Sequence, residues 1–482
     1  MEIEMNRNKF NNINIEEEDT ITAISTPLGI GGIGIVRISG PLSIPIASKI
    51  FRHKGKTKKS PSEFRSHNLY YGTIIQPDTE MLIDEVMLAI MRKPKTYTKE
   101  DIVEINCHGG LLVVRKVLEI VVKLGAKIAE PGEFTKIAFL NGRIDLSQAE
   151  AVIDIIEANN ERSLESSLYQ LSGGLREKIN HLKSRIVGLN TKIEAPMDFP
   201  DQGITELDKN EIKKTLKDCL SEVKKLLDTV RFGQIIKEGI CCVILGKTNV
   251  GKSSLFNVLL KKNRSIVTSL PGTTRDTIEE SINLKGFNFN LIDTAGMKNP
   301  ENIVEQISLK KVTDFMEYGQ MFIVMFDTSR PLDKQDVELI DKIKSFGNRN
   351  IKMIIIENKI DMPQQMDLSE LHKRLGIKET IKMSIKKKIG IELLENKMID
   401  NAMLDVNIPE GGLIVNNKRH QEFLLRVQER LSYIISNIDS GIKDDFVSMD
   451  LKYAANQLAR ITGESCDREL INNVFSKFCI GK

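Results

Sequence analysis

The most informative absence in this 482-residue sequence is that of a long hydrophobic run. No stretch approaches the roughly twenty consecutive apolar residues that a membrane-spanning helix needs. The N-terminal stretch holds no apolar run of the length found in signal peptides. Tryptophan is also absent, which, with the heavy use of lysine, isoleucine and asparagine, we attribute to genome composition. The sequence therefore predicts a cytoplasmic protein with no membrane partner.

Neither the cysteines nor the net charge indicate a special class of protein. The six cysteines show no spacing typical of a metal site, and without an export signal we expect reduced thiols. The 69 basic and 66 acidic residues leave a net charge of only +3. A polyanion such as a nucleic acid would therefore have to bind a local basic patch.

Changes in hydrophobic periodicity divide the chain into domains. After a polar start, mixed strand and helix patterns run to about residue 141, and a helical pattern follows, with Ser147 and Glu150 as a predicted capping box. Short apolar strands then alternate with helices, which is typical of a parallel sheet. We predict a polar extension at 1–18, an α+β domain at 19–141, an α/β domain at 238–400, and a discontinuous helical domain at 142–237 and 401–482.

The stretch GKTNVGKS is a P-loop in its required context, between an apolar strand and an apolar helix. Its glycines let backbone N–H groups face phosphates. Lys252 is expected to reach the β- and γ-phosphate oxygens, and Ser253 is expected to bind magnesium. The predicted nucleotide contacts in and beside this loop are Asn249, Val250, Gly251, Lys252, Ser253 and Ser254.

Three further motifs make GTP the predicted nucleotide. DTAG ends an apolar strand, where an acidic residue can hold magnesium through water. NKID ends another strand, and Asp361 is expected to accept hydrogen bonds from two donors on the guanine edge. PGTTRD supplies Thr274 as a second magnesium ligand, and Ser384 lies where a further guanine contact is expected, although Ile385 replaces the usual alanine. The predicted contacts in these segments are Pro271, Gly272, Thr273, Thr274, Asp293, Thr294, Ala295, Gly296, Asn358, Lys359, Asp361 and Ser384.

One residue that Ras-type GTPases use is missing. In those proteins a glutamine after DTAG orients the attacking water, but here Met297 follows, and its side chain cannot form such a hydrogen bond. Asn249 is a candidate ligand for a monovalent cation that acts in place of an arginine finger. Glu301 and Glu305 are candidates to orient water, although from the residues alone both are better explained as solvated charges at a helix end.

A distinctive set of motifs occurs in this one chain: GIGIVRISG, DIVEINCHGG, PGEFTKIAFLNGRIDLSQAEA, DFP, GTTRD, DTAGM and a terminal FCIGK. From about Asp19 to Lys482 the sequence resembles the MnmE (TrmE) family of tRNA-modification GTPases. The resemblance implies an N-terminal folate-binding and dimerising domain, a discontinuous helical domain and an inserted Ras-like P-loop GTPase domain. It also implies a homodimer that works with the flavoprotein MnmG, as a heterotetramer, on carbon 5 of the wobble uridine of tRNA. The group installed is of the aminomethyl type, such as carboxymethylaminomethyl, and 5-formyltetrahydrofolate or a related tetrahydrofolate supplies one-carbon units.

The same resemblance assigns further residues through their motifs. The family's folate-contacting positions fall on Arg37, Glu104, Arg143 and Lys482. Its GTP contacts extend to Thr268, Ser269 and Leu270, its potassium positions fall on Asn249, Thr268, Leu270 and Thr273, and its magnesium positions fall on Ser253 and Thr274. Glu305 aligns with the glutamate that orients water, which favours a catalytic role for it. The polar N-terminal extension and Ile385 depart from the family pattern.

The tail FCIGK makes Cys479 the fourth residue from the end of the sequence, as in a prenylation signal. Gly481 and Lys482 do not fit that signal, so we expect either packed structure or chemistry. The family resemblance implies a catalytic Cys479 near the modification site. Whether the thiol acts as nucleophile, acid or packed side chain stays open.

Two other functions compete with this interpretation. A ribosome-assembly GTPase that acts as an RNA-binding switch would share the GTPase motifs. A KH module, however, would add a GXXG loop in a βα pattern, whereas the C-terminal part here predicts helices. A folate-dependent one-carbon enzyme with a regulatory GTPase domain is the third possibility. The CHGG and FCIGK segments favour tRNA modification over ribosome assembly.

Overall fold

The computed structural model describes residues 19–55, 59–202, 207–263, 279–293, 320–345, 352–376, 379–404 and 414–482. The chain folds into two compact units. The first combines Met1–Ile153, Gln170–Glu194 and Leu451–Lys482, and the second combines Asp154–Tyr169 and Ala195–Asp450. Each unit is thus assembled from segments far apart in the sequence. The domain boundaries given above remain a prediction.

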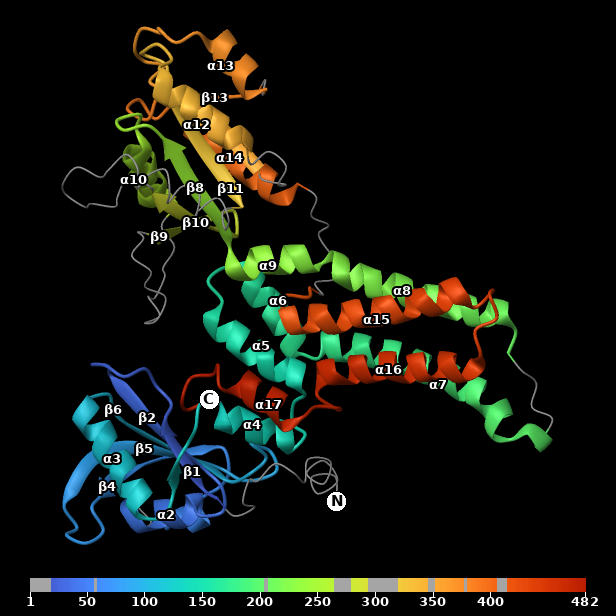
Figure 1. Cartoon of the computed structure of the whole chain (residues 1–482). Helices are drawn as coiled ribbons and strands as arrows, with labels where there is room; N and C mark the ends of the chain where they lie inside the picture. The colour runs from blue at the N-terminus through green and yellow to red at the C-terminus, as the bar shows by residue number, and fades with distance from the viewer. Residues whose placement is uncertain are drawn as a thin grey trace. The chain divides into compact units, whose positions relative to one another are not determined.

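A seven-stranded sheet forms the core of the first unit (Figure 1). Its strands are β1 (Ile21–Ile24), β2 (Ile33–Ser39), β3 (Phe51–His53), β4 (Asn68–Ile75), β5 (Leu82–Met91), β6 (Ile102–His108) and β7 (Lys127–Ile128). They lie in the order β3-β4-β5-β6-β2-β1-β7, with antiparallel neighbours except for the parallel pair of β1 and β7. Alternate residues of β5, Val86, Leu88 and Ile90, are buried in a cluster with residues of the helices α2 and α3. One face of this sheet is therefore covered, as the period of two in the sequence requires.

The C-terminal tail also belongs to the first unit. The helices that contribute to this unit are α2 (Ser43–Ile50), α3 (Leu111–Lys123), α4 (Glu133–Leu140), α5 (Leu146–Glu157), α7 (Gly174–Asp198), α16 (Asp444–Thr462) and α17 (Arg468–Phe475), with a short 3₁₀ turn at Pro61–Glu63. Phe139 of α4, Leu146 of α5 and Phe475 of α17 share one buried cluster. An added Cβ at Gly132 would lie 2.7 Å from Phe475 O, so the tail backbone lies directly against the start of α4.

The start of α5 corrects the predicted capping box. The helix begins at Leu146, so Ser147 lies inside the first turn and does not cap it. Asp145 caps instead: its Oδ1 accepts from the Gln148 N–H at 2.8 Å, and Gln148 Oε1 accepts from the Asp145 N–H at 3.0 Å. The Ser147 hydroxyl donates to the same Asp145 oxygen at 2.7 Å. The stretch DLSQAE contains two overlapping box patterns, and the prediction chose the wrong one.

A six-stranded sheet forms the core of the α/β part of the second unit. Its strands are β8 (Ile240–Gly246), β9 (Glu279–Leu284), β10 (Phe287–Asp293), β11 (Met321–Asp327), β12 (Lys352–Asn358) and β13 (Ile381–Met383). They lie in the order β13-β12-β11-β8-β10-β9, parallel except for the antiparallel pair of β9 and β10. The strand order turns at β8, which has β10 on one side and β11 on the other. The carboxyl end of β8 therefore lies at the switch point where α/β proteins bind ligands.

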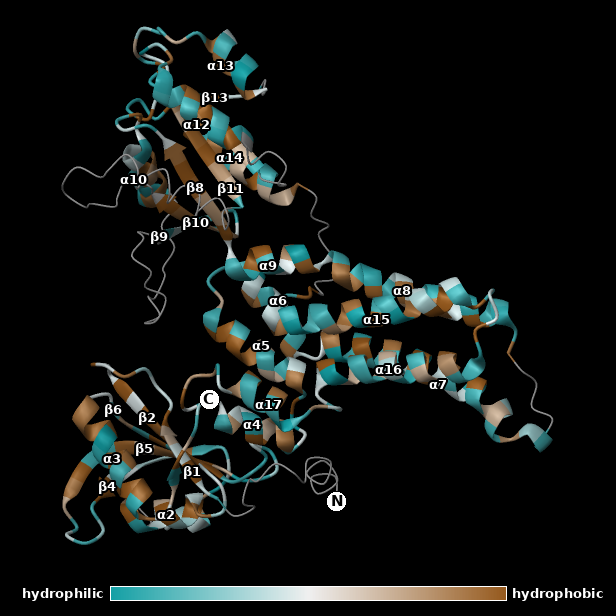
Figure 2. Cartoon of the chain, in the orientation of Figure 1, coloured by the Kyte–Doolittle hydropathy of each residue, from teal (hydrophilic) through white to brown (hydrophobic). Residues whose placement is uncertain are grey.

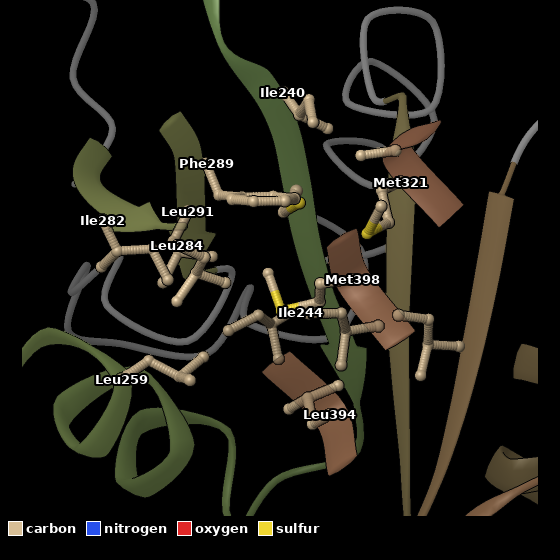
Figure 3. Packing of buried hydrophobic residues seen from close by; sticks show 14 of the residues in the cluster. Ile240, Ile244, Leu259, Ile282, Leu284, Phe289, Leu291, Met321, Leu394 and Met398 are labelled. Atoms are coloured by element: carbon tan, nitrogen blue, oxygen red, sulfur yellow. The ribbon is translucent and has the colours of Figure 1, made fainter. Parts of the chain in front are cut away.

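Helices cover this sheet, and its strands are correspondingly apolar. The helices of the second unit are α6 (Glu161–Leu171), α8 (Lys209–Asp228), α9 (Val230–Glu238), α10 (Lys252–Asn263), α12 (Lys334–Ser345), α13 (Leu368–Leu375), α14 (Ile391–Met403) and α15 (Lys418–Asn437), with a 3₁₀ turn at Pro200–Gln202. Every residue of β11 is buried, and Figure 2 shows β8, β10 and β11 as hydrophobic strands. Ile244 and Phe289 pack on one face with Met398 of α14 (Figure 3), whereas Phe322 packs with Leu371 of α13. None of the described helices in either unit is long and apolar enough to cross a membrane.

The two connections of the α/β part to the helices lie against each other. The chain enters β8 from α9 and continues at residue 414 towards α15. The Val415 N–H donates to Thr229 Oγ1 at 3.0 Å. Asp154, which is 5% exposed, accepts from Lys237 Nζ at 2.6 Å and from Asn416 Nδ2 at 3.2 Å. These buried contacts join both connections at one point, as an insertion into a helical domain requires.

Gly233→Ala tests this junction. Gly233 lies within α9, where alanine normally favours the helix by roughly 1 kcal/mol. An added Cβ would, however, lie 2.4 Å from Val415 O, a backbone atom of the second connection. We expect a net loss of about 1–3 kcal/mol, which urea unfolding followed by circular dichroism measures.

The matched control is Gly188→Ala in α7, where an added Cβ meets nothing within 4 Å. This variant is expected to be neutral or slightly stabilising. If both variants unfold at the same urea concentration, the two connections are not closely packed.

Candidate functional site

The P-loop follows β8 and leads into α10, and its backbone conformation requires glycine at two positions. Gly246 has φ +147° and Gly251 has φ +110°. An added Cβ would lie 2.7 Å from Met325 O at the first position and 2.6 Å from Asn358 Nδ2 at the second. Asn249 between them also has a positive φ of +63°. The loop therefore turns tightly against β11 and β12, with no room for side chains on that side.

The cation and hydroxyls predicted to contact phosphates lie at the start of α10. Lys252 is buried at 7% exposure, and its Nζ donates to Gly246 O at 2.9 Å and to Lys247 O at 2.7 Å. Ser253 and Ser254 are exposed in the same first turn. The backbone N–H groups of a first helical turn lack helical partners and carry partial positive charge. Together these groups form a site suited to an anion such as a phosphate.

Asn358 joins the predicted base-binding motif to the P-loop. Its side chain is 2% exposed, and Nδ2 donates to Val250 O at 2.7 Å, across 108 residues of sequence. Its Oδ1 accepts from the Ile385 N–H at 3.4 Å. One amide side chain thus contacts both the phosphate-binding loop and the segment after β13. Breaking it would leave buried polar groups unpaired, at a cost of about 1–3 kcal/mol.

Asp361 and Ser384, the two predicted guanine contacts, lie together. Ser384 Oγ donates to Asp361 Oδ1 at 2.6 Å. This hydrogen bond, with the nearby charges of Lys387 and Lys386, lowers the pKa of the Asp361 carboxyl. The carboxylate is therefore ionised near neutral pH and acts only as an acceptor, as recognition of two N–H donors requires.

Ile385 fits its position although it departs from the expected alanine. Its side chain is 9% exposed and belongs to the apolar cluster beneath the sheet. Its Cδ1 would lie 3.1 Å from a Cβ added to Gly251. The larger side chain therefore fills space under the P-loop and does not displace Ser384.

Three ion pairs near this edge of the sheet were not predicted. Lys359 Nζ donates to Asp327 at 2.6 Å. Burial acts to raise the pKa of Asp327, but the hydrogen bonds from Lys359 and Ser329 outweigh it and lower that pKa. Lys247 of the P-loop donates to Asp333 and, at 3.1 Å, to Asp336. The partners are 32 to 89 residues apart, so spacing in the sequence gave no signal for them.

The other predicted nucleotide contacts are only partly covered by the structure. Asp293 ends β10 in register with Ile244 of β8, so its backbone lies at the same edge as the P-loop. The predictions that fall outside the described residues are Thr268, Ser269, Leu270, Pro271, Gly272, Thr273, Thr274, Thr294, Ala295, Gly296, Met297, Glu301 and Glu305.

A second group of predicted residues lies in the first unit, at the C-terminal tail. Arg37 of β2 and Glu104 of β6 are paired across the sheet, and Arg37 Nε donates to Glu104 Oε1 at 2.8 Å. Arg37 Nη1 and Ser25 Oγ both donate to Gly481 O at 3.2 Å. Gly481 has φ +91°, and an added Cβ would lie 2.6 Å from Ile24 O. The tail is therefore held against the sheet by polar contacts and by a glycine that permits close approach.

Arg143 connects to this group through aromatic residues. Its guanidinium lies 4.6 Å from the centroid of the Tyr97 ring, a cation–π distance. The Tyr97 hydroxyl shares a hydrogen bond with Thr135 Oγ1 at 2.9 Å. The neighbouring Phe134 ring lies 5.6 Å from the Arg37 guanidinium. Arg143 is thus connected to Arg37 through Tyr97, Thr135 and the adjacent residue Phe134.

Further groups lie beside the tail. Cys479 is exposed and carries a free thiol. The backbone carbonyl of Cys479 accepts a hydrogen bond from the Gly132 N–H at 3.4 Å. Lys482 is half-buried. A cavity of about 280 Å³ reaches Ile24 and is lined mainly by the glycine-rich turn at 26–34 and the start of α3. This region therefore combines a carboxylate, cations, a thiol and an apolar cavity.

Comparisons with known proteins identify the family of the chain. A family model described as the MnmE helical domain matches residues 146–479, and one described as the GTP-binding protein TrmE N-terminus matches residues 20–143. The tRNA modification GTPase MnmE of Thermoanaerobacter pseudethanolicus is 46% identical over 466 residues, which cover 96% of this chain and 99% of that protein. The chain belongs to the MnmE family of tRNA-modification GTPases. The MnmE of Carboxydothermus hydrogenoformans is 43% identical and is covered along its whole length.

Solved structures of separate GTPases match a smaller part of the chain. The G domain of the Thermotoga maritima FeoB iron transporter is 28% identical, and the match covers 34% of this chain and 98% of that one, with a TM-score of 0.26. Aquifex aeolicus Era, bound to GDP and tetrafluoroaluminate, is 22% identical over 39% of this chain and 66% of its own, with a TM-score of 0.27. The predicted membership of the MnmE family and the predicted fold class are confirmed by the family models and the fold of the two units.

Asp361→Asn is expected to change the preferred nucleotide. An amide presents a donor where the carboxylate presents an acceptor, so it opposes one N–H of guanine and suits the carbonyl of xanthine. We expect GTP affinity to fall at least tenfold, with a gain for xanthosine triphosphate. Titration of the protein with fluorescent analogues of GTP and of xanthosine triphosphate measures both affinities. Unaltered GTP affinity would remove Asp361 from the base-binding site.

Proposed function

We propose that this chain hydrolyses GTP and uses hydrolysis to drive modification of carbon 5 of the wobble uridine in tRNA. The observation that carries this proposal is the whole-length relationship: the matched region, 96% of the chain, includes both the nucleotide-binding edge and the tail. MnmG is the proposed partner, and an aminomethyl-type group such as carboxymethylaminomethyl is the product. The Arg37–Gly481 contact gives the tail a defined place in the N-terminal region, which favours tRNA modification over ribosome assembly.

The nucleotide is held at the edge of the second sheet. Lys252 and the first turn of α10 bind the phosphates, and Asp361 with Ser384 recognises guanine. Ser253 is exposed in that turn, and its hydroxyl would bind a metal ion together with Thr274. Magnesium there would neutralise charge on the β- and γ-phosphates. The proposed roles thus divide the site into a phosphate end and a base end, which Asn358 holds together.

Potassium is the proposed substitute for an arginine finger. Asn249 is exposed in the P-loop at a positive φ, so its amide oxygen is available to a cation. Thr268, Leu270 and Thr273 complete the proposed set of ligands. Because Met297 offers no hydrogen bond, Glu305 is the proposed residue that orients the attacking water.

A tetrahydrofolate such as 5-formyltetrahydrofolate is the proposed one-carbon donor. The groups beside the tail fit such a molecule, because the Glu104 carboxylate suits the N–H donors of a pterin and the cations Arg143 and Lys482 suit its carboxylates. Arg37 orients Glu104 through their 2.8 Å hydrogen bond. Cys479 is exposed in the same C-terminal tail, and its thiol is the proposed group for chemistry on the uridine.

The proposed assembly is a homodimer joined by MnmG in a heterotetramer, acting on tRNA in the cytoplasm. The family resemblance supports this proposal. Analytical ultracentrifugation of the two purified proteins, separately and mixed, measures both associations.

Hydrolysis is expected to depend on potassium. Steady-state GTP turnover in potassium buffer is expected to exceed that in sodium buffer at least tenfold at equal ionic strength. Equal rates would rule out the cation mechanism. Glu305→Ala is expected to lower the turnover number by about 10²–10³ with little change in GTP affinity, because it removes a group that acts on water. A fully active variant would remove Glu305 from that role.

Cys479→Ser separates the two activities of the chain. GTP turnover is expected to stay near wild type, because the nucleotide-binding residues lie in the other unit. Modification is expected to fall sharply, since a hydroxyl is a far poorer nucleophile and acid than a thiol near neutral pH. The measurement pairs GTP turnover with the modified uridine of tRNA from cells that carry only the variant. Wild-type modification would show that Cys479 has no chemical role.

A further inference from the structure

The segment from Arg52 to His67 is the most basic local feature of the N-terminal region. It contains six lysines and arginines against one glutamate, whereas the whole chain carries a net charge of only +3. This segment includes β3 and leads to β4, at the end of the first sheet. None of the residues proposed for GTP or folate binding lies in it. Its charge therefore needs a separate explanation.

Aromatic residues hold the described parts of this segment together. The rings of Phe64 and Tyr70 are stacked, with centroids 3.7 Å apart and an angle of 8° between them. His53 of β3 meets both rings edge-on, at 5.3 and 6.0 Å. The Tyr70 hydroxyl accepts from the Arg65 N–H at 2.7 Å. The backbone that carries Arg65 is thus fixed to strand β4.

Arg92 connects the chain that follows β5 to this segment. Arg92 Nη2 donates to Ser62 O at 2.7 Å and to Phe64 O at 3.4 Å, and its N–H donates to Ser66 Oγ at 2.9 Å. These contacts place the chain after β5 against residues 62–66. Lys93, the next residue, is exposed beside them.

The cations of this region differ in their partners. Lys54 pairs with Glu85, and Arg52 lies 3.9 Å from Glu80. Within the described residues, the structure records no salt bridge from the side chains of three exposed cations, which are Lys59, Arg65 and Lys93.

Glu63, the one acidic residue of the segment, binds a backbone N–H group and not one of these cations. Glu63 Oε2 accepts from the Ser60 N–H at 2.9 Å, as part of the capping box of the 3₁₀ turn at Pro61–Glu63. Asp101 Oδ1 accepts from the backbone N–H of Lys93 at 2.9 Å, but the structure records no ion pair of the three side-chain cations within the described residues. The three exposed cations therefore lie on a folded scaffold without a salt bridge there. When these cations bind a ligand, little backbone conformational entropy is lost, because the backbone that carries them is already ordered.

We propose that Lys59, Arg65 and Lys93 form a docking surface, the β3–β4 basic surface, for the phosphate backbone of the tRNA substrate. This inference rests on the proposed function, which requires the chain to hold a tRNA. Cations without bound carboxylates gain the most from phosphate contact, because binding releases counterions from the RNA. Such contacts position the RNA without reading its sequence, so the surface serves every tRNA substrate equally.

The test compares two triple variants of the full-length chain. Lys59→Gln, Arg65→Gln and Lys93→Gln together remove the surface, whereas Lys214→Gln, Lys224→Gln and Lys225→Gln remove three exposed charges from α8. Fluorescence anisotropy measures the affinity of each protein for a labelled tRNA transcript at several salt concentrations.

The surface triple variant is expected to bind tRNA roughly tenfold more weakly than wild type at about 0.1 M salt, and the slope of log affinity against log salt should fall by about 2–3. The α8 triple variant should change the affinity less than about twofold. GTP turnover of both variants should equal wild type, which shows that they are folded. Equal tRNA affinity of the two triple variants would overturn the proposal.

Further outcomes separate the alternatives. If the surface triple variant loses binding to phosphatidylglycerol vesicles but keeps its tRNA affinity, the surface faces lipid and the proposal is wrong. Lys59→Arg with Lys93→Arg should retain tRNA binding, because phosphate contact needs only the charge.

Normal wobble modification in cells that lack the chain would reject the proposed function itself. Normal tRNA binding by the surface triple variant, with modification still dependent on the chain, would reject only the docking surface.

Discussion

The amide of Asn358 is the interaction on which the nucleotide site depends. It lies at the end of β12 and donates to Val250 O in the P-loop, while its oxygen accepts from the Ile385 N–H. Gly251 permits this approach, because any side chain there would collide with the amide. The phosphate end and the base end of the site are therefore not independent. A change that moves one of them has to break a buried hydrogen bond or move the other.

The tail imposes a comparable constraint on the first unit. Gly481 O accepts from Arg37, which also holds Glu104, so the backbone of the C-terminal motif and the sheet form one polar cluster. α17 and α4 support this cluster through a shared apolar core. The two proposed chemistries thus occupy separate units.

The sequence predicted the elements better than the contacts between them. Continuous apolar runs such as that of β11 and the P-loop spacing predicted a parallel sheet with a nucleotide at its edge, and the fold class is confirmed. The helix start at Leu146 was predicted wrongly, because DLSQAE offers two capping patterns and only packing chooses between them. The pairs of Lys247 with Asp333 and Asp336, and the contact of Arg37 with Gly481, join residues far apart in the sequence. No local pattern encodes them, and the folate and potassium positions remain predictions from the family resemblance.

The central claim, that this chain couples a GTPase site to tRNA modification, is tested most directly by the nucleosides of cellular tRNA. Total tRNA from a strain that lacks the chain is digested and analysed by liquid chromatography and mass spectrometry. The account predicts loss of the C5-aminomethyl-type wobble uridines, recovery with the wild-type chain, and no recovery with Asn358→Ala. An unchanged nucleoside profile in the deletion strain would contradict it.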